Sequence, residues 1–195
     1  MIQFIKPGLK ISSILIGGIL VSSCASVNVS EYPNITITED KKVKTIKFTN
    51  NLTASNEKIV SCVKQHVENK EIPINHSVTS WAAFTIFALL PDKKDTIPEG
   101  DVVILNENGV IKAAGNIELE STVNGRNFLM FLLTVSNPLP GETELLYNNP
   151  SIVVEDAGYG KNPGAFPLGS HYRALFEKSY YALEKLSGEL EKCLM

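Results

Sequence analysis

The sequence predicts an α+β fold in which an antiparallel sheet, with a central three-strand meander, carries two helices packed on one face. One supporting observation is strand-like alternation interrupted by Asn-Gly turns in the middle of the chain, and the other is two stretches whose apolar residues recur every three or four positions. Hydrophobic residues make up 44% of the 195 residues, enough for one globular domain with a core. We therefore expect a single folded domain after an N-terminal leader.

The predicted meander lies between residues 102 and 135. Residues 102–105 are apolar, and the Asn-Gly pair at 108–109 is a strong signal for a two-residue hairpin turn. Apolar and polar side chains alternate along residues 110–120, as in a strand with one buried face. A second Asn-Gly pair at 124–125 leads into residues 128–135, which are apolar on both faces and predict a strand inside a covered sheet.

Two helices are predicted from apolar stripes. Residues 55–70 begin with a serine suited to an N-cap and carry apolar residues at spacings of three and four. The last helix starts near Tyr172, and its stripe consists of Phe176, Tyr180, Leu183, Leu186, Leu190 and Cys193. Cys62 lies beside the first stripe, so a cysteine of each helix is expected to face a neighbouring element.

The segments between these elements are predicted as strands and loops. Residues 34–50 predict two short strands around a charged turn. Residues 138–150 predict a loop with at most one helical turn, and residues 152–154 a short strand. Residues 158–169 are rich in glycine and proline, which predicts another loop.

Residues 77–90 form an apolar run without clear periodicity. Their β-branched and aromatic content favours a strand, whereas Ser80 as a cap and Pro91 as a stop would frame a short helix. We expect the run to be buried and favour the strand, with the helix left open.

The first 23 residues have the layout of a secretory signal peptide. Lys6 and Lys10 precede an apolar run of about 11 residues, and the small residues Ser22 and Ser23 follow it. A membrane-spanning helix needs roughly 20 apolar residues, so a permanent transmembrane anchor is the weaker interpretation. We expect this segment to be removed from the mature protein.

The sequence Val21-Ser22-Ser23-Cys24 resembles the lipobox of bacterial lipoproteins. The resemblance implies cleavage by signal peptidase II before Cys24, a diacylglycerol on its thiol, and an acyl chain such as palmitate on its amine. Several acyl chains on one residue hold a protein on a membrane far more firmly than one chain does. In this class of protein, Ala25 as the second mature residue implies transfer to the outer membrane.

The resemblance at the leader and the patterns of the remaining residues together predict three parts in the chain. Residues 1–23 are a lipoprotein signal peptide, residues 24–33 are the lipidated N-terminus and a short linker, and residues 34–195 are a single periplasmic α+β domain. The protein would then be lipid-anchored on the periplasmic face of the outer membrane. The open alternative is an ordinary cleaved signal next to an unmodified cysteine.

Three cysteines are an odd number for a secreted protein. If Cys24 carries lipid, Cys62 and Cys193 remain as an even pair in the oxidising periplasm, where disulfides persist. We predict that these two are bonded, which would close a loop of about 130 residues. The alternative is two buried thiols that do not meet.

Composition and motifs argue against several classes of function. The chain has 18 Lys plus Arg against 21 Asp plus Glu, and it has no cluster of basic residues of the kind that binds nucleic acid. His66, His76 and His171 have no partners at metal-ligand spacing, and motifs of hydrolases and nucleotide-binding loops are absent. We therefore expect no enzymatic activity, no metal and no cofactor.

Residues 158–164 are the most distinctive loop of the sequence. They lack the order of glycine, lysine and serine or threonine that a phosphate-binding loop requires. Glycine frees the backbone there, while Tyr159 and Lys161 offer stacking and charge. We assign Tyr159 and Lys161 to a candidate recognition loop.

The expected function is that of a membrane-anchored periplasmic lipoprotein that acts as a non-enzymatic binding or accessory component of a cell-envelope assembly, with an envelope protein as its partner. The alternative is a carrier of a lipid or other apolar ligand. Residues 77–90 and 128–135 motivate this alternative, because they hold more apolar surface than a thin two-layer core needs.

Overall fold

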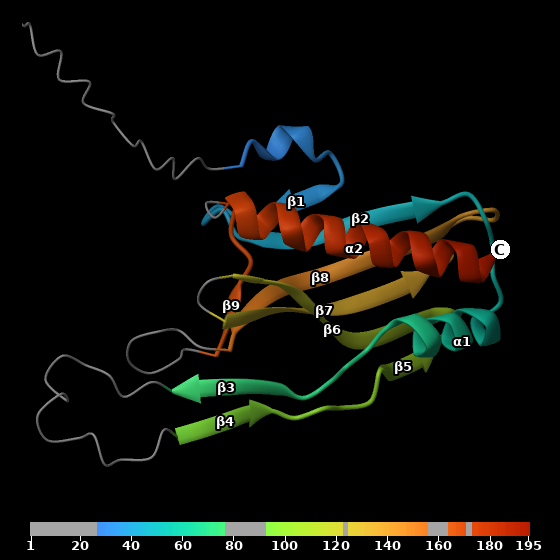
Figure 1. Ribbon diagram of the computed structural model, residues 1–195. Helices are drawn as coiled ribbons and strands as arrows, with labels where there is room; N and C mark the ends of the chain where they lie inside the picture. The colour runs from blue at the N-terminus through green and yellow to red at the C-terminus, as the bar shows by residue number, and fades with distance from the viewer. Residues whose placement is uncertain (1–26, 77–92, 123–124, 156–163, 171–172) are drawn as a thin grey trace, which may run out of the picture.

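The structure is a computed structural model that describes residues 27–76, 93–122, 125–155, 164–170 and 173–195. A seven-stranded antiparallel sheet forms the main layer, and two helices lie on one face of it (Figure 1). The predicted α+β class is therefore confirmed. The elements are η1 (Val29–Glu31), β1 (Ile35–Ile37), β2 (Val43–Asn50), α1 (Asn56–His66), β3 (Ile72–His76), β4 (Lys93–Ile97), β5 (Val103–Glu107), β6 (Val110–Thr122), β7 (Gly125–Ser136), β8 (Thr143–Val154), β9 (Ala165–Pro167) and α2 (Arg173–Leu194).

The strands of the main sheet follow the order β1-β2-β8-β7-β6-β5, and β9 pairs with the end of β8. The predicted meander corresponds to β5, β6 and β7, which are neighbours in the sheet. It does not form the centre, because β8, β2 and β1 extend the sheet beyond β7. The prediction of a central three-strand meander was therefore too narrow for this seven-stranded sheet.

The turn between β5 and β6 is the one that the sequence predicts. Asn108 has φ 51° and Gly109 has φ 75°, so both residues lie in the left-handed region. A two-residue hairpin turn of type I′ requires this conformation, because its twist matches that of the flanking strands. The Asn-Gly pair therefore determines the register of this hairpin.

The prediction of a loop at 138–150 was wrong, because most of this segment belongs to β8. β8 pairs with β2 on one side and with β7 on the other, and its residues Thr143, Leu145 and Tyr147 are fully buried. The turn-like signals are real: Asn149 has φ 46°, and Pro150 has no N–H to donate. A β-bulge accommodates both residues opposite a single position of β7.

Helix α1 begins where the sequence predicts it but ends at His66 rather than at residue 70. Ser55 caps it, since its hydroxyl accepts a hydrogen bond from a first-turn N–H at 3.3 Å. Beyond the helix, the Glu68 carbonyl accepts the N–H of Asn116 and the Lys70 carbonyl accepts its side-chain amide, both at 2.7 Å. The extended chain thus supplies hydrogen-bond acceptors to Asn116 on the part of β6 that β5 does not reach. A helix continued to residue 70 would leave these groups without those partners.

Helix α2 lies along the sheet with its predicted stripe inward. Phe176, Leu183, Leu186 and Leu190 of this stripe are buried. A disulfide joins Cys62 of α1 to Cys193 of α2, with their Cα atoms 5.8 Å apart and 131 positions between them in sequence. The predicted pair is therefore present, and it fastens the two helices to each other.

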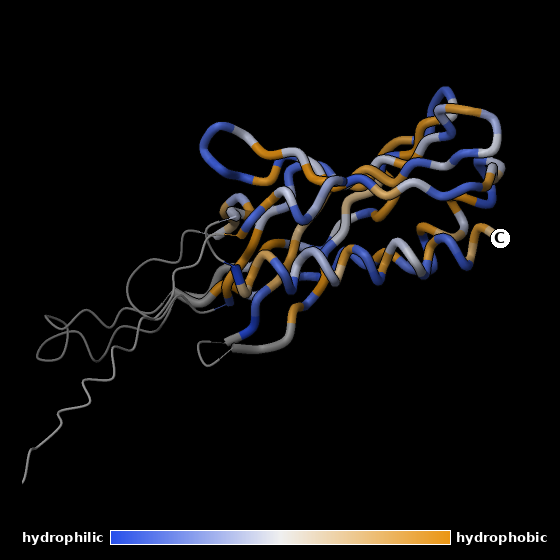
Figure 2. The backbone as a smooth tube through the Cα atoms, turned by 90° about the horizontal axis from the view of Figure 1, so that it is seen from above, coloured by the Kyte–Doolittle hydropathy of each residue, from blue (hydrophilic) through white to orange (hydrophobic). Residues whose placement is uncertain are grey.

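The main core lies between the sheet and the helices (Figure 2). Alternate residues of each strand point into it, because successive side chains of a strand leave opposite faces. Tyr147 of β8 lies in its middle, with ring centroids 5.3 Å from Phe131 and 6.0 Å from Phe48 in edge-to-face geometry. The core thus combines aliphatic burial with an aromatic cluster.

A smaller layer covers part of the opposite face. β3 and β4 form a separate antiparallel hairpin, paired from Ile72 with Ile97 to His76 with Lys93. Its buried side chains, Ile72 and Ile74, pack on Phe128 and Val153 of the main sheet. The apolar run 77–90 lies outside the described residues, so its predicted strand is neither confirmed nor corrected.

The described chain starts close to the sheet. Val27 is buried, and the ring of Tyr32 lies 5.2 Å from that of Phe176. Val27 and Tyr32 therefore pack on the domain, and the predicted boundary between a linker at 24–33 and a domain from residue 34 stays a prediction. Within the described part of the chain, no helix is long and apolar enough to cross a bilayer.

Candidate functional site

The sheet face that points away from the helices carries the broadest candidate surface, which we call the open face. Strand register places its side chains in two rows across β6, β7, β8 and β2. One row consists of Lys112, Thr134, Leu146 and Lys47, and the other of Ala114, Leu132, Asn148 and Thr45. The residues that alternate with them, such as Tyr147, point into the main core.

The open face combines apolar and polar groups. Leu132 and Leu146 are half-buried, and the β3–β4 hairpin covers only the neighbouring rows around Phe128. The Asn148 amide donates to the Leu132 carbonyl at 3.3 Å and to the Thr134 hydroxyl at 3.1 Å, which fixes its orientation. A mixture of apolar and polar groups of this kind is typical of protein contact surfaces.

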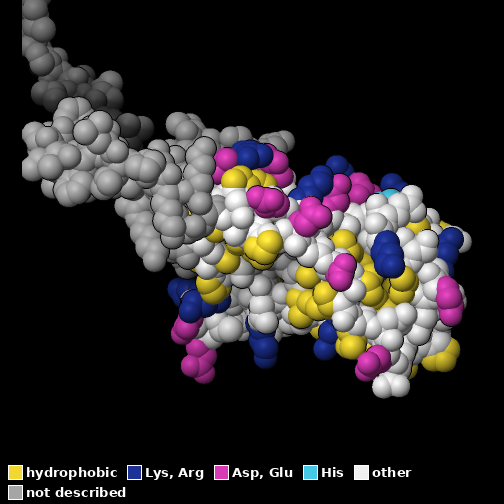
Figure 3. Space-filling model, turned by 90° about the horizontal axis from the view of Figure 1, so that it is seen from below, with side chains coloured by type: hydrophobic (Ala, Val, Ile, Leu, Met, Phe, Trp, Pro, Cys, Tyr) yellow, Lys and Arg dark blue, Asp and Glu magenta, His cyan; other side chains and the backbone are white. Residues whose placement is uncertain are grey.

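The charged groups of this surface differ in exposure: Lys47 is exposed, whereas Lys112 and Glu144 are half-buried. The Lys47 ammonium lies 3.3 Å from a Glu144 carboxylate oxygen across β2 and β8. Figure 3 shows that hydrophobic and charged side chains are also interspersed on the side seen from below. Because the Lys47 side chain is about half exposed, its ion pair with Glu144 contributes little to stability.

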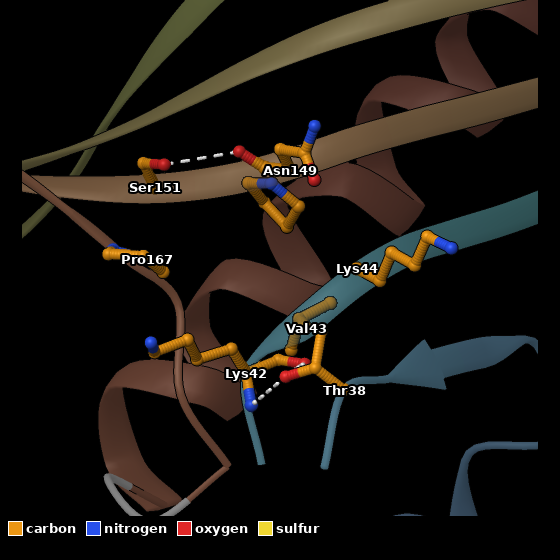
Figure 4. Close-up of a pocket in the computed structure, with 8 residues that line it drawn as sticks. Thr38, Lys42, Val43, Lys44, Asn149, Ser151 and Pro167 are labelled. Atoms are coloured by element: carbon orange, nitrogen blue, oxygen red, sulfur yellow. Dashed lines mark hydrogen bonds between the residues drawn. The ribbon is translucent and has the colours of Figure 1, made fainter. Parts of the chain in front are cut away.

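A pocket of about 230 Å³ lies beside the open face, where β8 exchanges its partner β2 for β9 (Figure 4). It is lined by Thr38, Lys42, Val43, Lys44, Asn149, Pro150, Ser151 and Pro167. The bulge at Asn149 and Pro150 opens this space, because β8 pairs with β2 before the bulge and with β9 after it. The pocket is therefore a consequence of the same β-bulge whose turn-like residues led to the prediction of a loop.

The polar groups of the pocket do not converge on a common point. The side chains of Lys42 and Lys44 extend in different directions in Figure 4, and the Lys42 ammonium pairs with Asp40 at 3.2 Å. The Thr38 hydroxyl accepts the Lys42 N–H at 3.2 Å, and the Ser151 hydroxyl donates to the Asn149 carbonyl at 3.1 Å. These lining residues offer neither an activated nucleophile nor an acid–base pair.

The size of the pocket bears on the alternative of an apolar-ligand carrier. Ligand pockets usually enclose about 300–1,000 Å³ and bury most of the ligand. At about 230 Å³, this surface pocket is smaller than that range. The carrier function remains a prediction, which native mass spectrometry of the purified protein would test by detecting a retained ligand.

The described residues offer no cluster for a metal ion and, at His66, no cysteine–histidine pair. Across the described ranges, no three His, Cys, Asp or Glu side chains lie close enough together to hold a metal ion. His66 is half-buried in the last turn of α1, near the half-cystine Cys62. Because Cys62 is bonded to Cys193, it offers no thiolate to a neighbouring base.

An ion pair with two hydrogen bonds links the start of β7 to the end of β8. The Arg126 guanidinium donates to Glu155 through Nε and Nη2, each at 2.9 Å, and lies 5.4 Å from the ring centroid of Phe128. The hydrogen bond to Glu155 raises the pKa of Arg126 above its ordinary value. This ion pair joins the first residues of β7 to the residue that follows β8, and we assign it a structural role.

The structure brings together only one of the predicted sets of site residues. Cys62 and Cys193 form the disulfide, whereas Cys24, Tyr159 and Lys161 lie outside the described residues. The open face was missed, although the alternation of residues 110–120 already indicated a second, more polar sheet face. Assembling it required the register of β8 with β7 and β2, which no local pattern contains.

Comparisons with known proteins give no family. No family model matches the chain, and no curated protein matches its sequence. Similar solved structures include a TBP-like protein from Parabacteroides distasonis, with 8% identity, a TM-score of 0.46, and coverage of 80% of this chain and 95% of that one. A DUF4468 family protein from Bacteroides ovatus has 11% identity and a TM-score of 0.47, with coverage of 86% of this chain and 95% of that one. No residue role is transferred from either.

Proposed function

We propose that the chain is a lipoprotein whose Cys24 is acylated, and whose domain serves as a non-enzymatic binding or accessory component of a cell-envelope assembly. The observation that carries the proposal is a lipobox-like sequence followed directly by a domain fastened with a disulfide. Disulfides persist in oxidising compartments such as the periplasm and are rare in the cytosol. The Cys62–Cys193 bond therefore supports the compartment that the leader implies.

The binding role is supported by the open face. Leu132 and Leu146 lie half-buried among lysines, threonines and an oriented amide, and no described cluster supplies a nucleophile with a base. A protein surface of this composition resembles a contact surface more than a reaction centre. We place the protein on the periplasmic face of the outer membrane because Ala25 follows the acceptor cysteine, as the lipoprotein resemblance implies.

Metabolic labelling tests the anchor. Bacteria expressing the full chain are grown with an alkyne analogue of palmitate, and the purified protein is probed for the label. The label should be present in the native protein and absent from Cys24→Ser, while the matched variant Cys62→Ala/Cys193→Ala should keep it. An unlabelled native protein, or label that survives in Cys24→Ser, contradicts the proposal.

Sorting is tested by a single substitution beside the anchor. Separation of inner and outer membranes should place the native protein in the outer membrane. Ala25→Asp should shift it toward the inner membrane without changing its acylation. A native protein found in the inner membrane contradicts the proposed location and leaves the anchor unaffected.

Site-directed photocrosslinking tests the binding role of the open face. A photoreactive residue at Leu146 is compared with one at Lys185, which is exposed on the outer side of α2. We expect one dominant protein adduct in intact cells from the open face and none from the control position. Identical adduct patterns at both positions contradict a specific role for the open face.

A further inference from the structure

Two neighbouring rows of the open face carry opposite charges, and both run across β5, β6, β7, β8 and β2. The acidic row consists of Glu107, Val110, Ser136, Glu144 and Thr49. The basic row consists of Leu105, Lys112, Thr134, Leu146 and Lys47. Residues between the rows along each strand, such as Ile111 and Leu145, point into the main core. The two rows together therefore present two glutamates and two lysines, whose charges balance.

One charge of each row has no counterpart within the described chain. The Lys47 ammonium and the Glu144 carboxylate already lie 3.3 Å apart. Among the described residues, Glu107 and Lys112 have no ion-pair partner. Glu107 is exposed, and Lys112 is half-buried. Each of them can therefore pair with an opposite charge on another molecule.

The balanced pattern favours a partner that carries the same two rows. A uniformly acidic or uniformly basic partner would meet like charges on one of them, which is unfavourable. A second copy of the chain can meet the open face about a two-fold axis that lies between the two sheets. An axis along the strands would set each row against itself. An axis across the strands, between the two rows, sets the acidic row of each copy against the basic row of the other.

We propose that the open face binds the open face of a second copy, with the two-fold axis running across the strands between the acidic and basic rows. The inference rests on the proposed binding role of this face and names its occupant. Glu107 and Lys112 belong to neighbouring strands, which lie about 4.8 Å apart. Glu107 of each copy therefore reaches Lys112 of the other, and the symmetry forms this ion pair twice.

The dimensions of the face indicate a reversible dimer. Five strands at a spacing of about 4.8 Å make it roughly 20 Å wide, and the alternate residues 110 to 116 of β6 extend it roughly 20 Å along the strands. About 400 Å² on each copy is half of the roughly 800 Å² that a standard stable interface buries per partner. The β3–β4 hairpin lies clear of this contact, because it covers Phe128, three rows beyond the basic row.

The arrangement is compatible with two lipid anchors in one membrane. Figure 1 shows η1, near the start of the described chain, beside β1 and across the sheet from β5. Rotation about an axis across the strands leaves the β1 edge on the same side in both copies. Because only three residues separate Val27 from Cys24, both proposed anchors would start on that side. Tethering to one surface raises the local concentration of copies, which favours a weak contact.

Photocrosslinking in intact cells identifies the occupant. Two differently tagged copies of the full chain are expressed together, and one of them carries a photoreactive residue at Thr134, in the middle of the basic row. We expect a dominant adduct that contains both tags, and its loss when the photoreactive residue is placed at Lys185 on α2. A dominant adduct with a different protein overturns the inference and leaves the proposed binding role intact. No adduct above that of the control position overturns both.

Charge reversals test how the rows face each other. Glu107→Lys or Lys112→Glu, made in both tagged copies, sets like charges against each other twice and should reduce the two-tag adduct roughly tenfold. One copy with Glu107→Lys and the other with Lys112→Glu form both ion pairs again, so the adduct should return to the native level. The matched control Lys185→Glu, on the outer side of α2, should leave the adduct unchanged.

The mixed pair of variants separates a lost contact from a misfolded chain, because misfolding would not be repaired by mixing. Single reversals that leave the adduct unchanged overturn the inference. A loss that the mixed pair does not recover also overturns it. Disulfide formation in each variant verifies folding, and palmitate labelling of the same cells reports separately on the anchor.

Discussion

The hydroxyl oxygens of Tyr147 and Ser187 lie 2.9 Å apart in the main core and join strand β8 to helix α2. Tyr147 is fully buried and Ser187 nearly so. Burial raises the pKa of the Tyr147 phenol far above its ordinary value, and the hydrogen bond to Ser187 opposes this only in part. The pair thus satisfies two polar groups inside an otherwise apolar layer.

The variant Tyr147→Phe should lower the free energy of unfolding by about 1–3 kcal/mol, because it leaves the Ser187 hydroxyl buried without its partner. Urea unfolding at neutral pH measures the loss. The double variant Tyr147→Phe/Ser187→Ala should recover part of it, since both polar groups are then removed. Losses that simply add in the double variant would show that the two hydroxyls do not interact.

Stability should decline in alkaline solution. The pKa of Tyr147 is raised in the folded state above the ordinary value of 10.0, so its contribution to stability is complete below pH 10 and is lost as the pH rises above that value. Each pH unit in that range removes at most about 1.4 kcal/mol through this group. Urea unfolding at a series of pH values should therefore show a steeper alkaline loss for the native protein than for Tyr147→Phe. Parallel losses in the two proteins would assign the decline to other groups.

The regular parts of the fold could be predicted because their signals are local. The Asn-Gly turn at 108–109 and the stripe of α2 each need only a few neighbouring residues. β8 was missed because Asn149 and Pro150 carry genuine turn signals, and only pairing with β7 makes them a bulge. The alternation of Thr143, Leu145 and Tyr147 was the signal that could have found this strand.

The candidate surfaces were harder to predict than the fold. The open face brings together residues of four strands, such as Lys112 and Lys47, through their register. The pocket at Asn149 exists because β8 changes partners, which is a property of topology rather than composition. By contrast, pairing of Cys62 with Cys193 could be predicted from cysteine parity, once the resemblance to lipoproteins assigned Cys24 another role.

A methyl group at Gly115 should destabilise the domain. A Cβ there would lie 2.6 Å from Val67 Cγ1 and 2.7 Å from Phe131 Cζ, and both of these side chains are buried. We expect Gly115→Ala to cost about 1–3 kcal/mol of unfolding free energy through overpacking. Adding Val67→Ala should recover part of the loss by removing the nearest contact.

Gly188 is the matched control for this substitution. It lies inside α2, and a Cβ there would meet no atom within 4 Å. Gly188→Ala should therefore raise the free energy of unfolding by about 0.5–1 kcal/mol, because alanine favours the helix. Chemical denaturation of both variants compares the same added methyl group in two settings. Equal effects at Gly115 and Gly188 would contradict the close packing of β6 against Val67.

Removal of the disulfide should lower the free energy of unfolding more than the substitutions at Tyr147 and Gly115 do. The bond between Cys62 and Cys193 closes a loop with a sequence separation of 131, and an unfolded chain with so long a loop loses much conformational entropy. We expect Cys62→Ala/Cys193→Ala to lower the free energy of unfolding by about 2–5 kcal/mol and to increase the urea m-value, since the unfolded state becomes more expanded. Native protein unfolded in the presence of a reductant should match the double variant. If the reduced native protein and the double variant were both as stable as the oxidised form, packing of α1 and α2 on the sheet would hold the helices without the covalent link.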